Sequence, residues 1–248
     1  MEASDFIKRI EDLAERCERT GSVTSTAFLT PAELFELRKW LNAHPDTACL
    51  LSGGAPDCER QAAFFLPWFL PAEELNLSER IKAVCLQGCF GTPGHRDYLG
   101  ALMGLGIKRE WLGDLQLEGD RAYLFCLPSV LPSVLQLERA GRITVKAREI
   151  PLSEVPAIER KVKQLSFTVR SLRLDAVTGE LFSLSRSKAQ EALALGLVSL
   201  NYEVCLKPDA EVREGDVISL RGKGKGQLTA IGGRSKKDRL FLEAERFL

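Results

Sequence analysis

The chain contains 248 residues, and its 34 Lys and Arg residues balance its 34 Asp and Glu residues. An apolar content of 45% is typical of globular proteins rather than disordered chains, and the length is sufficient for two or three small domains. No apolar run approaches the roughly 18 residues of a membrane span, and the charged N-terminus does not have the pattern of a signal peptide. Seven irregularly spaced cysteines and two histidines favour a reduced, cytoplasmic protein without a zinc site.

Residues 1–75 are predicted to form an N-terminal α/β domain. Thr30 and Glu33 form a capping box, with proline at the first helical position. Gly53 and Gly54 could cradle a phosphate, but they lack the lysine and the spacing of a nucleotide-binding loop, so we interpret them as a turn. The expected elements are helices at 3–20 and after residue 30, and strands at 48–51 and 62–66.

Residues 76–155 are predicted to form a ferredoxin-like domain with the order βαββαβ, the plan of RNA-recognition modules. Tyr123 and Phe125 alternate onto one face of a strand, where they could stack on bases or pack in a core. The expected elements are a strand at 81–86, a helix at 97–105, a hairpin of 114–117 with 121–126, a helix at 128–140 and a strand at 143–147.

A helix is predicted after Ser185, a good N-cap residue, and Gly196 ends it. Arg186 and Lys188 lie in its first turn, where the helix macrodipole disfavours cations. This placement suggests a nearby anion, and free first-turn amides suit a phosphate. The alternative is a solvated helix start. A preceding helix is expected from the spacing of apolar residues at 169, 172, 176 and 177, with Arg170 and Arg173 projecting from it.

The C-terminal part of the chain is more basic than its remainder. Residues 170–239 carry 13 Lys and Arg against 9 Asp and Glu, a net charge of +4. They include the segment RGKGKG at 221–226. Phosphate contacts dominate affinity for nucleic acids, so this asymmetry favours RNA binding.

This order of elements resembles the alpha-L RNA-binding motif, which is named after a small-subunit ribosomal protein and is shared with many pseudouridine synthases and tyrosyl-tRNA synthetases. The resemblance rests on Arg173–Asp175, Ser185–Ala189, Gly196–Val198, Asn201 and Glu214–Ile218. It implies a C-terminal RNA-binding domain over 168–248. The expected RNA-binding residues in this domain are Arg170, Arg173, Ser185, Arg186, Ser187, Lys188, Asn201, Arg221, Lys223 and Lys225.

A glycine-rich stretch at 91–115 extends the resemblance to the YlmH family of bacterial RNA-binding proteins. The similar segments are His95–Leu102, Gly104–Glu110 and Gly113-Asp114. The resemblance implies an α+β protein of three small domains that binds ribosomal and transfer RNA on stalled large ribosomal subunits. It also implies a link to cell division in some bacteria, and a related branch is tied by name to photosystem II. Lys108 and Arg109 follow glycines and are expected to reach a partner, with a solvated turn as the alternative.

No catalytic residue, cofactor or metal is expected. Asp175 follows Arg173 as the catalytic aspartate of pseudouridine synthases often follows an arginine, but we interpret it as a partner of Arg173 or of a nearby amide. The segment His95-Arg96-Asp97 could provide a general base, but the start of a helix, with Asp97 near its N-terminus, explains these residues more simply. The alternatives to a non-enzymatic RNA-binding protein are an RNA-modifying enzyme of the pseudouridine-synthase type and an adaptor that binds a protein through its N-terminal domain.

Overall fold

The computed structural model describes residues 3–157, 162–235 and 237–247. It divides into two compact units, Met1–Ile158 and Glu159–Leu248, which we call unit 1 and unit 2. The fold is of mixed helix and sheet, as expected. No helix in the described part of the chain is both long enough and apolar enough to cross a membrane.

The N-terminal part of unit 1 packs two helices against a small sheet of strand order β1-β3-β2. Its elements are α1 (Ala3–Thr20), β1 (Thr24–Ser25), α2 (Pro31–Ala43), β2 (Cys49–Ser52) and β3 (Ala62–Phe65). The capping box is confirmed, since the Thr30 amide donates to Glu33 Oε2 at 2.7 Å and the Glu33 amide donates to Thr30 Oγ1 at 3.3 Å. The inner faces of both helices lie in one apolar core, to which α1 contributes Phe6 and Ile10 and α2 contributes Leu37.

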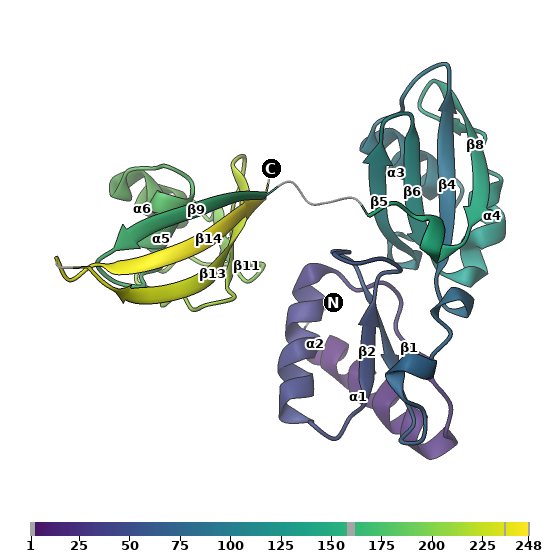
Figure 1. Cartoon of the computed structure of the whole chain (residues 1–248), viewed down its shortest axis with the longest axis horizontal. Coiled ribbons are helices and arrows are strands. Elements are labelled where there is room, and N and C mark those ends of the chain that lie inside the picture. The colour runs from purple at the N-terminus through teal and green to yellow at the C-terminus, as the bar shows by residue number, and fades with distance from the viewer. Residues whose placement is uncertain (1–2, 158–161, 236, 248) are drawn as a thin grey trace. The chain divides into compact units, whose positions relative to one another are not determined.

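The second part of unit 1 has the predicted βαββαβ order, with one additional two-residue strand, β7, before the last strand. Its elements are β4 (Lys82–Cys89), α3 (His95–Gly104), β5 (Leu112–Glu118), β6 (Arg121–Cys126), α4 (Leu131–Leu135), β7 (Arg139–Ala140) and β8 (Ile143–Ile150). The sheet order is β5-β6-β4-β8-β7, and Figure 1 shows the first four strands side by side.

The helix expected at 128–140 is shorter than predicted. A single 3-10 turn at Pro128–Val130 precedes α4, which has only five residues and carries Pro132 in its first turn. Arg139 and Ala140 instead form β7 and pair with Thr144 and Ile143. Pairing with β8 therefore overrides the helical spacing of the apolar residues.

The two faces of this sheet are covered differently. One face packs on α3 through Leu86, Leu124 and Tyr98. The other face packs on the N-terminal part of unit 1, where Tyr123 and Phe125 join Phe64 in a shared core. Core packing is therefore the observed role of the two alternating aromatic residues.

Glycines allow the two sheets of unit 1 to approach each other closely. Gly54 has φ +100°, and a Cβ there would lie 2.5 Å from the Phe125 ring. A Cβ on Gly113 would lie 2.8 Å from the Phe28 ring. The Asp114 carboxylate completes the joint by accepting from the amides of Glu59 at 2.6 Å and Arg60 at 3.1 Å. Gly53-Gly54 thus serves packing, in agreement with the turn interpretation.

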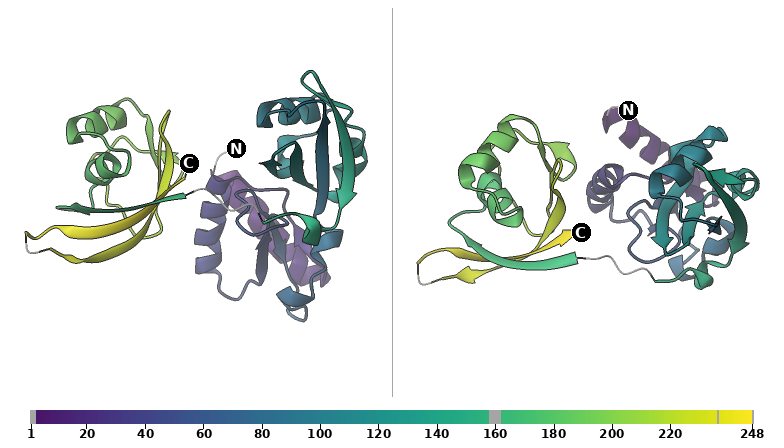
Figure 2. Two further views of the ribbon diagram at one scale, coloured as in Figure 1. Left: turned by 45° about the horizontal axis from the view of Figure 1, so that its top comes forward. Right: turned by 90° about the horizontal axis from the view of Figure 1, so that it is seen from above.

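Unit 2 is one antiparallel sheet of order β11-β10-β12-β13-β14-β9 with two helices on one side, green in Figure 2. Its elements are β9 (Val162–Val169), α5 (Leu174–Leu181), α6 (Arg186–Ala194), β10 (Val198–Leu200), β11 (Glu203–Val204), β12 (Val217–Leu220), β13 (Gly224–Arg234) and β14 (Leu240–Phe247). Leu174, Val177 and Leu181 of α5 lie in its core.

The first helix of unit 2 begins later than the apolar spacing predicts, so the predicted start is wrong. Val169 ends strand β9, where it pairs with Leu240, and α5 begins only at Leu174. Alternation of Leu165, Phe167 and Val169 places apolar residues on one face of a strand. Arg170 therefore belongs to the turn before α5 and not to a helix face.

Replacing Gly113 by alanine should destabilise unit 1 by about 1–3 kcal/mol, because the added Cβ overpacks the joint between the sheets. Urea unfolding followed by tryptophan fluorescence measures this effect, since all three tryptophans lie in unit 1. Gly100→Ala in α3 is the control: a Cβ there meets nothing within 4 Å, and alanine should stabilise a helix interior by up to about 1 kcal/mol. Equal effects of the two substitutions would contradict the packing role.

Candidate nucleic-acid interface

The candidate site in unit 2 is built around the buried carboxylate of Asp175. Asp175 lies in the first turn of α5, and its side chain is 0% exposed. Arg173 donates to both carboxylate oxygens at 3.1 Å. Arg186 Nε donates to Oδ2 at 3.2 Å, and Gln190 donates to the same oxygen at 2.7 Å. The expected partnership of Asp175 with Arg173 is confirmed, and Arg186 of the next helix joins it.

These contacts keep Asp175 ionised. Burial alone would raise the pKa of the carboxyl group, but the hydrogen bonds from Arg173, Gln190 and Arg186 outweigh it and lower the pKa from 3.8 to about 2. The guanidinium groups remain accessible, because the side chains of Arg173 and Arg186 are 37% and 60% exposed. One buried anion thus holds two accessible cations from neighbouring helices side by side.

The start of α6 presents further polar groups beside this pair. Ser185 caps the helix by accepting from the Lys188 amide at 3.3 Å, which confirms the predicted N-cap. Arg186, Ser187 and Lys188 are exposed in the first turn. Two cations, two hydroxyl groups and the amides of a helix start are therefore near one another on a solvent-facing surface.

The half-buried Asn201 side chain is held by hydrogen bonds within the protein. The residue has φ +50° in the turn between β10 and β11, and its side-chain amide donates to Asp216 at 2.8 Å and accepts from the Val217 amide at 3.0 Å. These bonds shape the turn. Arg170, by contrast, is exposed after β9.

The basic segment at 221–226 forms the turn between β12 and β13 and the first residues of β13. Arg221 and Lys223 are exposed there. Arg246 donates to the Lys223 carbonyl at 3.0 Å and lies 5.4 Å from the centre of the Phe182 ring. Because Phe182 directly follows α5, this turn is linked to the segment that leads into α6. Lys225 Nζ lies 5.3 Å from the ring centre of Phe247.

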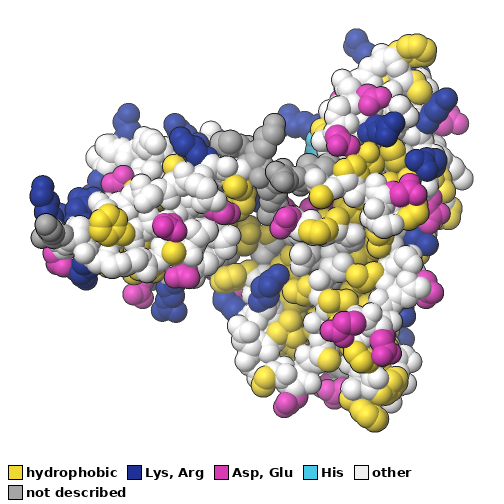
Figure 3. Space-filling view, viewed as in Figure 1, with side chains coloured by type: hydrophobic (Ala, Val, Ile, Leu, Met, Phe, Trp, Pro, Cys, Tyr) yellow, Lys and Arg dark blue, Asp and Glu magenta, His cyan; other side chains and the backbone are white. Residues whose placement is uncertain are grey.

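Arg246 was not among the predicted site residues. Its sequence signal is weak, since strand alternation near the C-terminus does not distinguish it from neighbouring charged residues. The space-filling view shows Lys and Arg side chains at several edges of unit 2 (Figure 3), so charge alone does not mark one site.

The side chains of Lys108 and Arg109 in unit 1 differ in exposure and in their contacts. Arg109 donates to the carbonyls of Leu112 at 2.6 Å and Gly113 at 3.0 Å. Burial, and then the nearby Arg60 cation, lower its pKa. Lys108 is exposed, with Nζ 5.2 Å from the centre of the Trp111 ring. Of the two, Lys108 is the side chain available to a partner, while Arg109 supports the loop.

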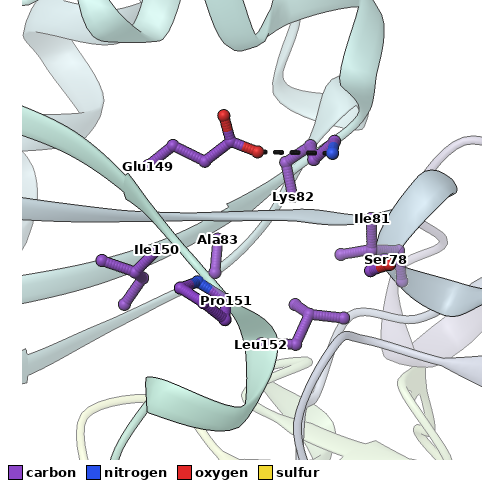
Figure 4. Close-up of a pocket in the computed structure, with 8 residues that line it drawn as sticks. All are labelled: Ser78, Ile81, Lys82, Ala83, Glu149, Ile150, Pro151 and Leu152. Carbon is purple, nitrogen blue, oxygen red and sulfur yellow. Dashed lines mark ion pairs between the residues drawn. The ribbon is translucent and has the colours of Figure 1, made fainter.

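The remaining candidates for chemistry have structural roles. Asp97 accepts from the Gly94 amide at 2.9 Å and so caps α3, which supports the helix-start interpretation of His95–Asp97. A pocket of about 330 Å³ lies between the start of β4 and the end of β8 (Figure 4). Its charged residues, Lys82 and Glu149, pair with each other at 3.3 Å. Among the described residues, no group of His, Cys, Asp and Glu side chains could hold a metal ion.

Replacing Asp175 by asparagine should destabilise unit 2 by about 2 kcal/mol at neutral pH, because the carboxylate has a lower pKa in the folded chain. A lowered pKa contributes stability that is complete above about pH 4 and is lost as the pH falls through about 2. The difference between wild type and variant should therefore shrink over this window.

Hydrogen exchange resolved to peptides of unit 2 measures this stability, because the tryptophans report only on unit 1. Asp46→Asn is the control, since Asp46 is exposed in unit 1. A difference between wild type and Asp175→Asn that stays constant from pH 7 to about pH 2 would contradict the electrostatic role.

Three family models match successive stretches of the chain: "YlmH, N-terminal" at residues 2–65, "Putative RNA-binding domain in YlmH" at 81–154 and "S4 domain" at 172–218. The chain is 35% identical over 224 residues to the "Ribosome-associated protein quality control protein P2" of Bacillus subtilis (strain 168), covering 89% of this chain and 86% of that protein. A solved structure, "Cell division protein ylmH from Streptococcus pneumoniae", is 21% identical with a TM-score of 0.49 over 62% of this chain and 89% of that chain. On the extent of the Bacillus match and the order of the three family models, the chain belongs to the YlmH family of RNA-binding proteins.

Proposed function

We propose that this protein is a non-enzymatic RNA-binding factor of the cytoplasm that associates with the large ribosomal subunit and contacts ribosomal and transfer RNA. The observation that carries the proposal is the pair of accessible arginines, Arg173 and Arg186, held by the buried Asp175. The name of the Bacillus relative, which refers to ribosome-associated quality control, supports the ribosomal part.

The arrangement suits phosphate recognition. A guanidinium group presents several N–H donors in one plane, and part of this set remains accessible after Asp175 is bound. Because Asp175 fixes both guanidinium groups, less side-chain entropy is lost when a phosphate binds. Lys188 and the first-turn amides of α6 add charge and donors to the same surface.

The structure favours this proposal over an RNA-modifying enzyme. A catalytic aspartate has to reach the reacting base, whereas Asp175 is fully buried and accepts hydrogen bonds from three side chains. Its role is to orient cations. Pseudouridine formed in RNA by the wild-type chain and lost with Asp175→Asn would overturn the non-enzymatic assignment.

Nothing among the described residues points to a link with cell division or photosystem II, or to an adaptor role of the N-terminal domain.

Replacing Arg186 and Lys188 together by alanine should weaken RNA binding and flatten its dependence on salt. Each phosphate contact releases counterions, so the slope of log K against log salt should change by roughly one unit per lost contact. Fluorescence anisotropy with transfer RNA at several salt concentrations measures both quantities. The control is Lys8→Ala with Arg9→Ala, two exposed cations of α1. An unchanged slope in the Arg186 and Lys188 variant would remove the α6 start from the binding surface.

Sedimentation through a ribosome gradient tests the ribosomal part of the proposal. The tagged wild-type chain should travel with large subunits, and crosslinked RNA should map to ribosomal and transfer RNA. The Arg186 and Lys188 variant should shift toward the top of the gradient, while the Lys8 and Arg9 control should not. Wild-type protein that stays at the top at physiological salt would contradict ribosome association but leave RNA binding intact.

A further inference from the structure

Part of the middle sheet of unit 1 has an open face. Strand register places directly opposite residues on the same side of a sheet. On the side away from α3 and α4, three adjacent cross-strand rows carry polar residues. The first row is Arg139–Thr144–Cys89, the second is Lys146–Gln87–Arg121–Glu118, and the third is Arg148–Cys85–Tyr123–Gln116.

The fourth row closes this face. It consists of Ile150, Ala83 and Phe125, all buried in the core shared with the N-terminal part of unit 1. Cys85 and Tyr123, at the centre of the third row, are buried in the same core, so that row is open only at Arg148 and Gln116. The N-terminal part of the chain therefore covers the strand aromatics, and the cations of the first three rows remain exposed.

The open rows are positively charged. They contain four exposed cations, Arg139, Lys146, Arg121 and Arg148, against the single carboxylate of Glu118. A second carboxylate, Asp120, lies in the adjoining turn and accepts from Gln87 at 3.1 Å. The carboxylates belong to the β5–β6 side, so the β4–β8 side is the more basic half. The space-filling view shows Lys and Arg side chains over this sheet, with carboxylates among them (Figure 3).

An exposed aromatic residue follows the end of β4, beside the first row. Phe90 directly follows β4, next to the first row, and its relative exposure is 108%. It also has φ +61°, a conformation that L-residues adopt rarely. Such strain persists where the surrounding structure holds it and often marks functional positions. A fully exposed ring with a strained backbone contributes nothing to the core, so the fold does not explain it.

We propose that the open face of β4, β8 and β7, together with Phe90, binds single-stranded RNA, with Lys146, Arg148 and Arg139 on phosphates and the Phe90 ring stacked on a base. The family model at residues 81–154 is described as "Putative RNA-binding domain in YlmH". This inference rests on the proposed RNA-binding function and adds the surface of unit 1 and the single-stranded class of RNA. Ring stacking on an unpaired base combined with a cationic track is the usual chemistry of single-strand binding. An RNA duplex offers no free base face to Phe90, and a basic protein would be repelled by the cations.

The experiment uses the full chain and a short fluorescein-labelled oligouridylate as the probe, with anisotropy as the readout. Phe90→Gly removes the ring and tolerates the positive φ, and it should weaken binding at least about fivefold. Phe90→Trp should retain wild-type affinity. Lys146→Ala with Arg148→Ala should reduce the salt slope by about 1.4, the value expected for two phosphate contacts of a single strand.

Matched controls come from the same unit. Trp68→Ala removes another exposed aromatic residue, 94% accessible, and Lys8→Ala with Arg9→Ala removes two other exposed cations; both should bind like the wild type. All variants are also measured in a chain carrying Arg186→Ala and Lys188→Ala, which weakens the site in unit 2.

The possible outcomes separate the two proposals. The second site alone would be overturned by one pattern of results. In that pattern, the Phe90→Gly chain and the Lys146 and Arg148 variant keep wild-type affinity and salt slope, while loss of Arg186 and Lys188 weakens binding. Wild-type binding in every variant would overturn both. If the Phe90→Gly chain lost as much affinity for a blunt RNA duplex as for the oligouridylate, the assignment to single strands would be overturned.

Discussion

The carboxylate of Asp175 is the interaction on which the candidate site of unit 2 depends. Removing a charge from water is expensive unless hydrogen bonds replace the lost solvent. Three side chains do so here, and they come from the residue before α5, from the first turn of α6 and from the middle of α6. Because one carboxylate accepts hydrogen bonds from all three side chains, it fixes the packing of α5 against α6 and the positions of Arg173 and Arg186.

A different constraint governs unit 1, where two sheets meet without space between them. Gly54 and Gly113 bring backbone against Phe125 and Phe28, and Asp114 ties the strands to the loop at Glu59. Part of the glycine-rich stretch therefore has a packing role. Gly113 serves contact between sheets, whereas Gly100 faces open space.

Local signals in the sequence were sufficient for most elements and their order. The capping box at Thr30, the N-cap at Ser185 and the βαββαβ order depend on neighbouring residues, and all are present. Predictions failed where long-range pairing decides. Val169 fits both a helix face and a strand face, and only its pairing with β14 selects the strand. The inward orientation of Arg109 depends on carbonyls in the following strand, which no local pattern reveals.

The core shared by the two parts of unit 1 has a consequence for how the chain can be divided. Family models end at residue 65 and begin again at 81, which suggests a cut between two independent modules. Phe64 and Phe125 nevertheless lie in one apolar cluster. A chain truncated to begin at residue 76 would expose that cluster to water and would be prone to aggregate. Modular boundaries in sequence families thus do not coincide here with the boundaries of the compact units.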